Sequence, residues 1–293
     1  MSMENSSAGT EDQQWQDTGL RRDRTAFAKQ IPLILLALAI LLPGYFMLIT
    51  PFKTQIDYSL SKLGLPTQFY LGSFETALRG GRFFLWLVNS IILALGSVVV
   101  ASVVSALGAF ALARMSFRGR AAMLTLNAAL MVLPPVVLII PIFLLYARLK
   151  MTSTYSGVIL VYAGLITPFA VYMLTNFFKS IPHEIIESAL IDGASSVVIL
   201  LRIILPLSAP ALVTMIVVSA LWVWNDLLIA LVLLPDDKLR SLMVGITLFG
   251  GRYSNDVPVA IAGMLMASLP MFILYVVGQR YFAHGLTAGA IKG

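Results

Sequence analysis

Long apolar runs separated by short polar segments fill the chain from about residue 31 to residue 281. A run of about 20 apolar residues is long enough for a helix to cross a lipid bilayer. Six runs meet this requirement, and the sequence therefore predicts an all-α membrane protein with six transmembrane helices. The predicted spans cover approximately residues 31–51, 83–113, 122–146, 156–178, 209–234 and 257–281.

The polar segments between these runs divide the chain further. Residues 1–30 form a polar tail with no apolar signal-peptide core ahead of the first span, and residues 282–293 form a C-terminal tail. Residues 52–82 carry several Gly and Pro, which indicates an extramembrane loop with a short amphipathic piece. Residues 179–208 form a longer interruption with a helical pattern of its own, and residues 235–256 connect the last two spans.

The composition agrees with a membrane protein. Apolar residues make up 59% of the 293 residues and charged residues only 12%, whereas soluble domains carry roughly a quarter charged residues. The net charge of +6 fits anchoring at the membrane surface better than nucleic-acid binding, because the basic residues lie at helix ends. The chain has no cysteine, which excludes disulfides and thiolate metal sites.

The basic residues also bear on orientation. Arg114, Arg118 and Arg120 follow the second span without an acidic neighbour, and four more basic residues precede the first span. Short cytoplasmic loops are enriched in Lys and Arg. The pattern modestly favours a cytoplasmic N-terminus, and an even number of spans then puts both termini in the cytoplasm.

Small residues recur every fourth position along the second span. Such spacing lets helix backbones approach closely in lipid. Two interpretations are open: a seam against another subunit, or a seam within the same bundle. The positions are Ser97, Ala101, Ser105, Ala109 and Ala113.

Prolines interrupt the third span. Pro134-Pro135 and Pro141 each remove a backbone donor and clash with the preceding turn, so we expect kinks there. Backbone groups freed at this depth are tolerated when they are buried in protein or line a wet cavity. The third span is therefore expected to line the pathway rather than to face lipid.

The polar interruption after the fourth span predicts two short helices. Ser180 and Pro182 suit a helix start, and Gly193 suits the position just past a helix end, where a left-handed conformation is needed. A second helix is expected to run to Leu205, with Pro206 stopping it at the membrane surface. From the residues alone, an amphipathic helix lying on lipid is the favoured interpretation. One apolar patch is expected on the first helix, made of Ile185, Ile186, Ala189 and Leu190.

This segment resembles the signature loop of the membrane subunits of bacterial binding-protein-dependent ABC importers. The matching elements are Glu187-Ser188-Ala189, Gly193 and Ile203-Ile204-Leu205-Pro206, with Ser188 where the family usually has Ala. The resemblance implies a type I ABC importer permease fold, with this loop docked into a partner ATPase. The residues that it assigns to ATPase coupling are Glu184, Ile185, Ile186, Glu187, Ser188, Ala189, Leu190, Asp192, Gly193, Ile203, Leu205 and Pro206.

The C-terminal residues 279–293 resemble the tail of the maltose/maltodextrin-type permeases and their carbohydrate-importer relatives. Asn89-Ser90, residues 113–117 and Trp224-Asn225-Asp226 share this resemblance, which extends from about residue 31 to the end. It implies that the tail reaches between two ATPase protomers and that the loop 235–256 enters the cleft of the solute-binding protein. The tail residues are Gly285, Leu286, Thr287, Gly289 and Lys292, and those of the loop are Gly250, Gly251 and Arg252.

Polar residues within the spans are candidates for the substrate path, because polar groups in a bilayer are costly and usually functional. Aromatic faces suit sugar rings, and amide and carboxylate groups suit hydroxyls. An interfacial Trp belt and an amide joining two helices are the structural alternatives. The candidates are Trp224, Asn225 and Asp226, the last being the only acid well inside a span, and, more weakly, Asn127, Tyr162 and Asn176.

The sequence lacks a phosphate-binding loop of the form G-x-x-x-x-G-K-[ST], so ATP hydrolysis by that route is not expected on this chain. His183 and His284 form no H-E-x-x-H motif, and we expect neither a metal site nor a catalytic site.

The resemblance implies a multi-pass protein of the bacterial inner membrane that imports a carbohydrate. The implied partners are a second homologous permease, a dimeric ATPase that holds ATP and Mg²⁺, and an external solute-binding protein. The competing hypotheses are an ion-coupled secondary transporter using Asp226 and an intramembrane enzyme.

Overall fold

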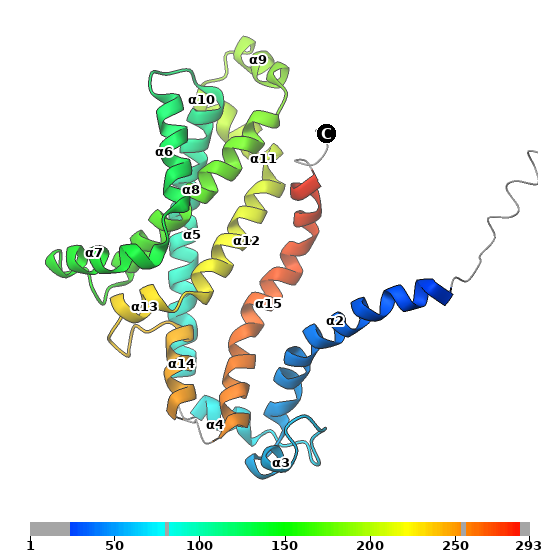
Figure 1. The fold of residues 1–293 in the computed structure, drawn as a ribbon. Helices are drawn as coiled ribbons and strands as arrows, with labels where there is room; N and C mark the ends of the chain where they lie inside the picture. The colour runs from blue at the N-terminus through cyan, green and yellow to red at the C-terminus, as the bar shows by residue number, and fades with distance from the viewer. Residues whose placement is uncertain (1–23, 80–81, 253–255, 288–293) are drawn as a thin grey trace, which may run out of the picture. The chain divides into compact units, whose positions relative to one another are not determined.

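The computed structural model describes residues 24–79, 82–252 and 256–287, and every regular element in these ranges is a helix (Figure 1). The chain divides into two units, residues 1–49 and residues 50–293, which are described separately.

In the first unit, α2 (Arg24–Ile49) continues through Pro32 and Pro43. Its apolar side chains are exposed around the whole helix from Ile31 to Leu42. A helix that is apolar on all sides is suited to lipid or to a membrane-embedded partner. The first predicted span corresponds to α2 and the short 3₁₀ turn η1 (Thr50–Phe52) that follows it.

The second unit holds the remaining helices. They are α3 (Gln55–Leu60), α4 (Gly72–Arg79), α5 (Phe83–Arg114), α6 (Arg120–Val132), α7 (Pro135–Arg148), α8 (Tyr155–Ser180), α9 (His183–Ile191), α10 (Ser196–Ile199), the π-helix η2 (Leu200–Ile204), α11 (Leu205–Leu207), α12 (Ala209–Asn225), α13 (Leu228–Leu233), α14 (Leu242–Arg252) and α15 (Val257–Thr287). By length and composition, four helices of the described residues could cross a membrane, or up to six if each bent pair is one span.

The small-residue face of α5 lies inside this unit. Ser97, Ala101, Ser105 and Ala109 are fully buried, and the packing is most extensive between α5 and α8, with α12 also against α5. Ala101 packs with residues of α8 and α12 in one apolar cluster, and Ala109 does so in a second. Of the two interpretations of the stripe, a seam within the same bundle is therefore confirmed.

The third predicted span, residues 122–146, is not one straight helix. It consists of α6 and α7, which meet at an angle of 98°. Leu133 and Pro134 are both extended, as expected for residues that each precede a proline. The kink expected at Pro134-Pro135 is confirmed, whereas Pro141 lies inside α7 without ending it.

The fifth predicted span, residues 209–234, is also divided. α12 ends at Asn225 and α13 begins at Leu228, so the uninterrupted helix expected from the apolar run is wrong. The segment expected to be a connecting loop, residues 235–256, contains α14. The last helix, α15, continues past residue 281 to Thr287.

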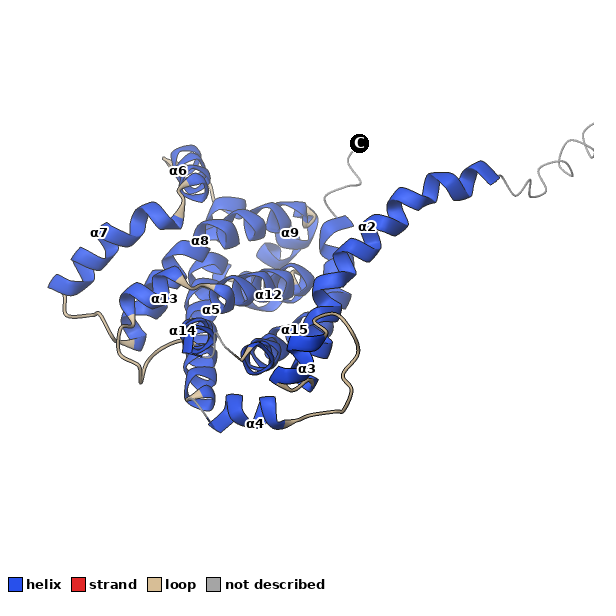
Figure 2. Cartoon of the chain, turned by 60° about the horizontal axis from the view of Figure 1, so that its bottom comes forward, coloured by secondary structure: helices blue, strands red, loops and turns tan. Residues whose placement is uncertain are grey.

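The two ends of this unit carry different elements. α9, α10 and the C-terminal end of α15 lie at one end, and α3, α4 and the beginning of α15 lie at the other (Figure 1). Viewed after a 60° turn, α5 lies between α8, α12 and α14, while α7 projects away from the bundle (Figure 2). The polar interruption 179–208 and the loop 52–82 therefore sit at opposite ends of the same bundle.

Candidate functional site

The helix α9 begins where the sequence predicts it. Pro182 is its N-cap residue, and Glu184 lies in the first turn, where the helix dipole favours an acidic side chain. His183 Nδ1 lies 3.0 Å from Glu187 Oε1 one turn later, and both side chains are largely exposed. These contacts favour the helical conformation locally without burying the polar face.

The end of α9 is a Schellman turn. The Ala194 amide donates to the Ala189 carbonyl over 2.9 Å, and the Gly193 amide donates to the Leu190 carbonyl over 3.0 Å. Gly193 has φ +79°, a left-handed value that other residues rarely adopt. The predicted role of Gly193 is confirmed.

The side chains of α9 divide between two faces. Ile186 and Ala189 are buried in an apolar cluster with Phe178 of α8, Ile204 of η2 and Met215 of α12. Ile185 and Leu190 are exposed, so the single apolar patch expected from the sequence is wrong. Helical geometry separates these pairs, because residues at i and i+3 share a face whereas neighbours do not. The exposed face carries Glu184, Ile185, Glu187, Ser188, Leu190, Ile191 and Asp192.

The segment after Gly193 differs from the prediction. Pro206 does not end the helix: α10, η2 and α11 form a continuous helical run to Leu207, and the chain bends by 78° only before α12. The Leu205 amide donates to the Leu200 carbonyl, five residues back. This wider π-turn accommodates a proline ring that would clash with the carbonyl four residues back in an α-helix. Ile203 and Leu205 are half-buried against the apolar cluster of α9.

Asp226 lies at the break between α12 and α13 rather than inside a helix. Its Oδ2 accepts from the Ile229 and Ala230 amides of α13, at 3.0 and 3.1 Å, and from the Tyr162 hydroxyl of α8 at 2.8 Å. Aspartate competes for backbone donors and is favoured at helix starts. The carboxylate therefore orders the first turn of α13 and ties the break to α8.

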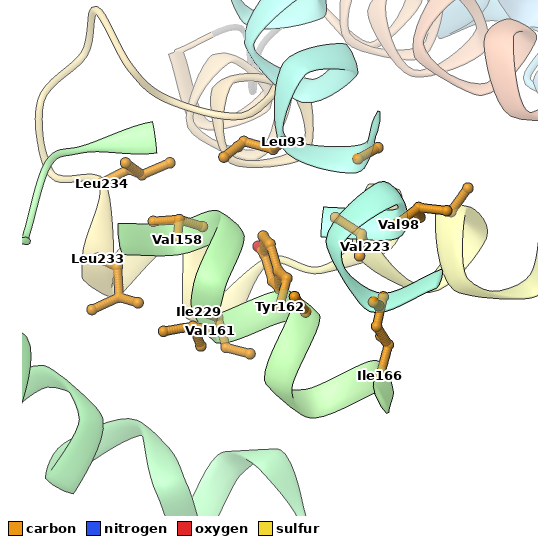
Figure 3. Close-up of a cluster of buried hydrophobic side chains, with 14 residues drawn as sticks. Leu93, Val98, Val158, Val161, Tyr162, Ile166, Val223, Ile229, Leu233 and Leu234 are labelled. Carbon is orange, nitrogen blue, oxygen red and sulfur yellow. The ribbon is translucent and has the colours of Figure 1, made fainter. Parts of the chain in front are cut away.

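Tyr162 is buried among apolar side chains of four helices, including Leu93, Val161 and Val223 (Figure 3). Its ring packs edge-on against that of Trp222, with centroids 6.0 Å apart. The structure thus joins Tyr162 and Asp226 by a hydrogen bond that holds α8 against the break between α12 and α13. The sequence analysis did not predict this contact.

The other candidates for the substrate path are dispersed. Trp224 is buried, and its Nε1 donates to the Ala267 carbonyl of α15 at 3.2 Å. Asn127 donates to the Pro168 carbonyl of α8 at 3.0 Å, which joins two helices, the structural alternative considered above. Asn176 is exposed on α8. Asn225 is exposed at the end of α12, where its amide donates to the Leu221 carbonyl of its own helix.

Two cavities adjoin these residues. One, of about 660 Å³, lies between α6, α7, α8 and α12 and is almost wholly apolar. The other, also about 660 Å³, has Pro134 and Pro135 on one side and Trp222, Asn225 and Asp226 on the other. Pro134 and Pro135 of the third predicted span thus line this second space, while the place of that span on a pathway stays a prediction. Its lining combines an aromatic ring, an amide and a carboxylate. Within the described residues, no group of three or more His, Cys, Asp or Glu side chains could hold a metal ion.

Residues 105–286 match the model of the family described as "Binding-protein-dependent transport system inner membrane component". The chain belongs to this family. It is therefore a multi-pass membrane component of a binding-protein-dependent transport system, and the family resemblance seen in Glu187, Ser188, Ala189 and Gly193 is confirmed.

Two curated relatives are similar over nearly their whole length. The chain is 32% identical to the sulfoquinovosyl glycerol transport system permease protein SmoH of Agrobacterium fabrum, over 92% of this chain and 96% of that protein. It is 31% identical to the melibiose/raffinose/stachyose import permease protein MelC of Bacillus subtilis, over 94% of this chain and 100% of that protein.

The fold is similar to that of a solved permease. A chain from the crystal structure of a bacterial ABC transporter involved in the import of the acidic polysaccharide alginate superposes with a TM-score of 0.79 and 25% sequence identity. The match covers 90% of this chain and 98% of that chain. The permease thus has the all-α, type I ABC importer permease fold predicted from its sequence.

The remaining candidate residues of the permease lie at the two ends. The backbone of Gly285, Leu286 and Thr287 is helical and continues α15, and Gly289 and Lys292 lie outside the described residues. The backbone of Gly250, Gly251 and Arg252 forms the last turn of α14.

Sequence reasoning missed the anchoring role of Arg114. From the end of α5, its Nη2 donates to the Ile181 carbonyl at 2.5 Å and to the Phe178 carbonyl. Phe178 lies in the last turn of α8, where its carbonyl also accepts from the Ile181 amide at 3.3 Å, and Ile181 is the residue that follows the helix. Arg114 therefore fixes the exit of α8, and with it the entry to α9, on the end of α5. The only signal in the sequence was its place in a basic cluster.

We expect Arg114→Met to lower the free energy of unfolding of the permease by about 2–3 kcal/mol, because two charge-assisted hydrogen bonds are lost and the Ile181 carbonyl loses its donor. Thermal unfolding of the purified complex in detergent, read by intrinsic tryptophan fluorescence, measures the change. Arg118→Met is the matched control, since Arg118 is exposed in the same connection. Equal melting temperatures for the two variants contradict the assignment.

Proposed function

We propose that this permease is the membrane-spanning subunit of an ATP-driven importer for a carbohydrate of oligosaccharide size, which an external solute-binding protein delivers. The observation that carries the proposal is the geometry of α9. A short helix ends in a glycine-dependent turn and carries an exposed face of acidic and apolar side chains at one end of the bundle. The relatives named above, one for sulfoquinovosyl glycerol and one for melibiose, raffinose and stachyose by name, support the carbohydrate class.

The proposed partners follow from what α9 exposes. Ile185, Leu190 and Ile191, flanked by Glu184 and Glu187, would enter a cleft on a cytoplasmic ATPase, with apolar side chains in its centre and acidic ones at its rim. The ATPase dimer would hold ATP and Mg²⁺, while the permease itself would bind no cofactor and catalyse no reaction. A second homologous permease would complete the pathway. Both termini would be cytoplasmic, and the end of α15 would reach the ATPase interface.

Mechanical coupling would use the contacts of α9 with the bundle. Ile186 and Ala189 share one apolar cluster with α5, α8 and α12. Arg114 ties α8 to α5 just before α9 begins. A displacement of α9 by the closing ATPase would therefore move these helices together, and the pathway would alternate between inward-open and outward-open states.

The substrate path would pass the cavity between Pro134-Pro135 and Trp222, Asn225 and Asp226. Trp222 can stack on a sugar ring, and the Asn225 amide can bond hydroxyls. Trp224, Tyr162 and Asn127 are engaged in contacts between helices, which supports a structural role for them. Asn176 would face the second permease or lipid.

The test is transport by the complete assembly in proteoliposomes. The permease, its homologous partner and the ATPase are reconstituted, ATP is enclosed on the ATPase side, and the loaded solute-binding protein is added on the other. We expect carbohydrate uptake that requires ATP hydrolysis and continues in the presence of an uncoupler. Uptake that persists without the ATPase and stops with the uncoupler would instead identify an ion-coupled transporter.

A further inference from the structure

Side chains at the beginning of α5 form hydrogen bonds with the backbone of the segment between α13 and α14. Asn89 is 1% exposed, and its Nδ2 donates to the Lys238 and Arg240 carbonyls, each over 2.9 Å. Its Oδ1 accepts from the Tyr155 hydroxyl at the start of α8, at 2.7 Å. Both N–H donors of this amide and its oxygen thus have partners, which are two carbonyls of one segment and a hydroxyl of another.

Two neighbours of Asn89 in α5, Trp86 and Ser90, extend this contact towards α14. The Ser90 hydroxyl, also buried, accepts from the Leu242 amide at 2.7 Å, which is the first residue of α14. Trp86 Nε1 donates to the Asp237 carbonyl at 3.3 Å. A side chain at Gly245 would meet the Trp86 ring, since its Cβ would lie 2.2 Å from a ring carbon. The backbone of α14 at Gly245 therefore packs directly against the Trp86 ring of α5.

Ion pairs and one more backbone bond surround this core. Arg82 lies 2.8 Å from one carboxylate oxygen of Asp237, and Arg240 lies 2.7 Å from the other. At the other end of the segment, the Ser153 amide donates to the Leu233 carbonyl at 2.8 Å. The segment from Leu233 to Leu242 is thus attached to α5 and to the start of α8 along its length. We call these attachments the Asn89 clamp.

We propose that Asn89, supported by Ser90, is a positioning residue that holds α14 rigidly on α5 and α8, so that the solute-binding protein meets this end of the permease in one conformation. The inference rests on the proposed function and on the contact with that protein that the family resemblance implies for residues 235–256, which include α14. α5 and α8 are also the helices that carry α9 at the opposite end. The clamp therefore makes the binding-protein end and the ATPase end parts of one rigid body.

The clamp predicts a specific defect. Without the Asn89 amide, α14 would occupy its bound position for only a fraction of the time, and the apparent affinity for the solute-binding protein would fall by that fraction. A purely structural residue would instead lower the amount of active complex, and hence the maximal rate, without changing the concentration that gives half the maximal rate.

The experiment uses the complete assembly in nanodiscs, with cysteine-free partner subunits. ATP hydrolysis is titrated with loaded solute-binding protein. We expect Asn89→Ala and Asn89→Asp to raise the half-saturating concentration about tenfold, because both lose the two N–H donors that bind the Lys238 and Arg240 carbonyls. Ser90→Ala should raise it about threefold, because it removes a single bond. The matched control is Ser102→Ala, also in α5, whose hydroxyl bonds only the Val98 carbonyl of its own helix and contacts one sulfur.

A second measurement does not depend on the solute-binding protein. The chain has no cysteine, and Leu248 on α14 is exposed, so a nitroxide on Leu248→Cys reports the mobility of α14. We expect a more mobile spectrum with Asn89→Ala and Ser90→Ala and an unchanged one with Ser102→Ala.

The outcomes separate this inference from the proposed function. An unchanged spectrum in the Asn89 variants, or a mobile α14 with the wild-type half-saturating concentration, overturns the clamp alone. A wild-type complex that hydrolyses ATP without regard to the solute-binding protein overturns the proposed function, and the role of the clamp with it. If the Asn89 variants do not assemble, Ser90→Ala provides the same comparison.

Discussion

Gly193→Val should abolish carbohydrate transport by the assembled importer, with at least a hundredfold loss of uptake. A β-branched residue at φ +79° is strained by about 1–2 kcal/mol. The helix can relieve this strain only by opening the two bonds of the Schellman turn, so the end of α9 would unwind and the exposed face with Glu187 and Leu190 would lose its shape. Uptake by proteoliposomes and ATP hydrolysis stimulated by the solute-binding protein measure the effect.

Gly119→Val is the matched control for this experiment. Gly119 has φ +92° and, like Gly193, no atom within 4 Å of the Cβ that a substitution would add. The backbone strain is therefore comparable, but the position lies between α5 and α6, outside the proposed docking segment. We expect this variant to assemble and to retain most of its transport. Equal losses in the two variants would show that backbone strain alone, rather than docking of α9, explains the defect.

The sequence predicted the helix boundaries of the proposed docking segment well up to Gly193 and less well after it. A left-handed helix end is reported by one residue type, so Gly193 could be recognised from its position after an apolar helical pattern. Pro206 was misread because a proline normally ends a helix, whereas here the π-turn at η2 widens the helix around it. No single residue type indicates a π-turn in a sequence, so this turn could be found only in the structure.

The spans were predicted from apolar length, which does not report bends or breaks. The apolar runs around Pro134 and Asp226 are continuous in hydropathy, yet the first bends by 98° and the second is broken by a carboxylate that accepts three hydrogen bonds. Likewise, the spacing of Ser97 and Ala101 predicted close helix packing without identifying the partner helix. Partners far apart in sequence, such as Asn89 with Lys238 and Arg114 with Ile181, leave no periodic signal.

Asp226→Ala should destabilise the permease by about 2–4 kcal/mol, because the Tyr162 hydroxyl and the amides of Ile229 and Ala230 would lose their acceptor in a buried site. Asp226→Asn keeps an oxygen at the same place, so it should retain most of this stability and at least about a third of the transport activity. The remaining loss is expected because neutral hydrogen bonds replace charge-assisted ones. Thermal unfolding and ATP-driven uptake of both variants, beside Asn225→Ala as a neighbouring substitution, provide the measurement.

The two variants also discriminate between mechanisms. An ion-coupled transporter that used Asp226 as its proton or sodium site would need a group that can carry charge, so Asp226→Asn would abolish transport as completely as Asp226→Ala. For a carboxylate that caps α13 and bonds Tyr162, the acceptor oxygen matters more than the charge. A fully inactive but stable Asp226→Asn permease would therefore contradict the structural role argued here. An active Asp226→Asn permease would agree with transport driven by the ATPase that α9 is proposed to engage.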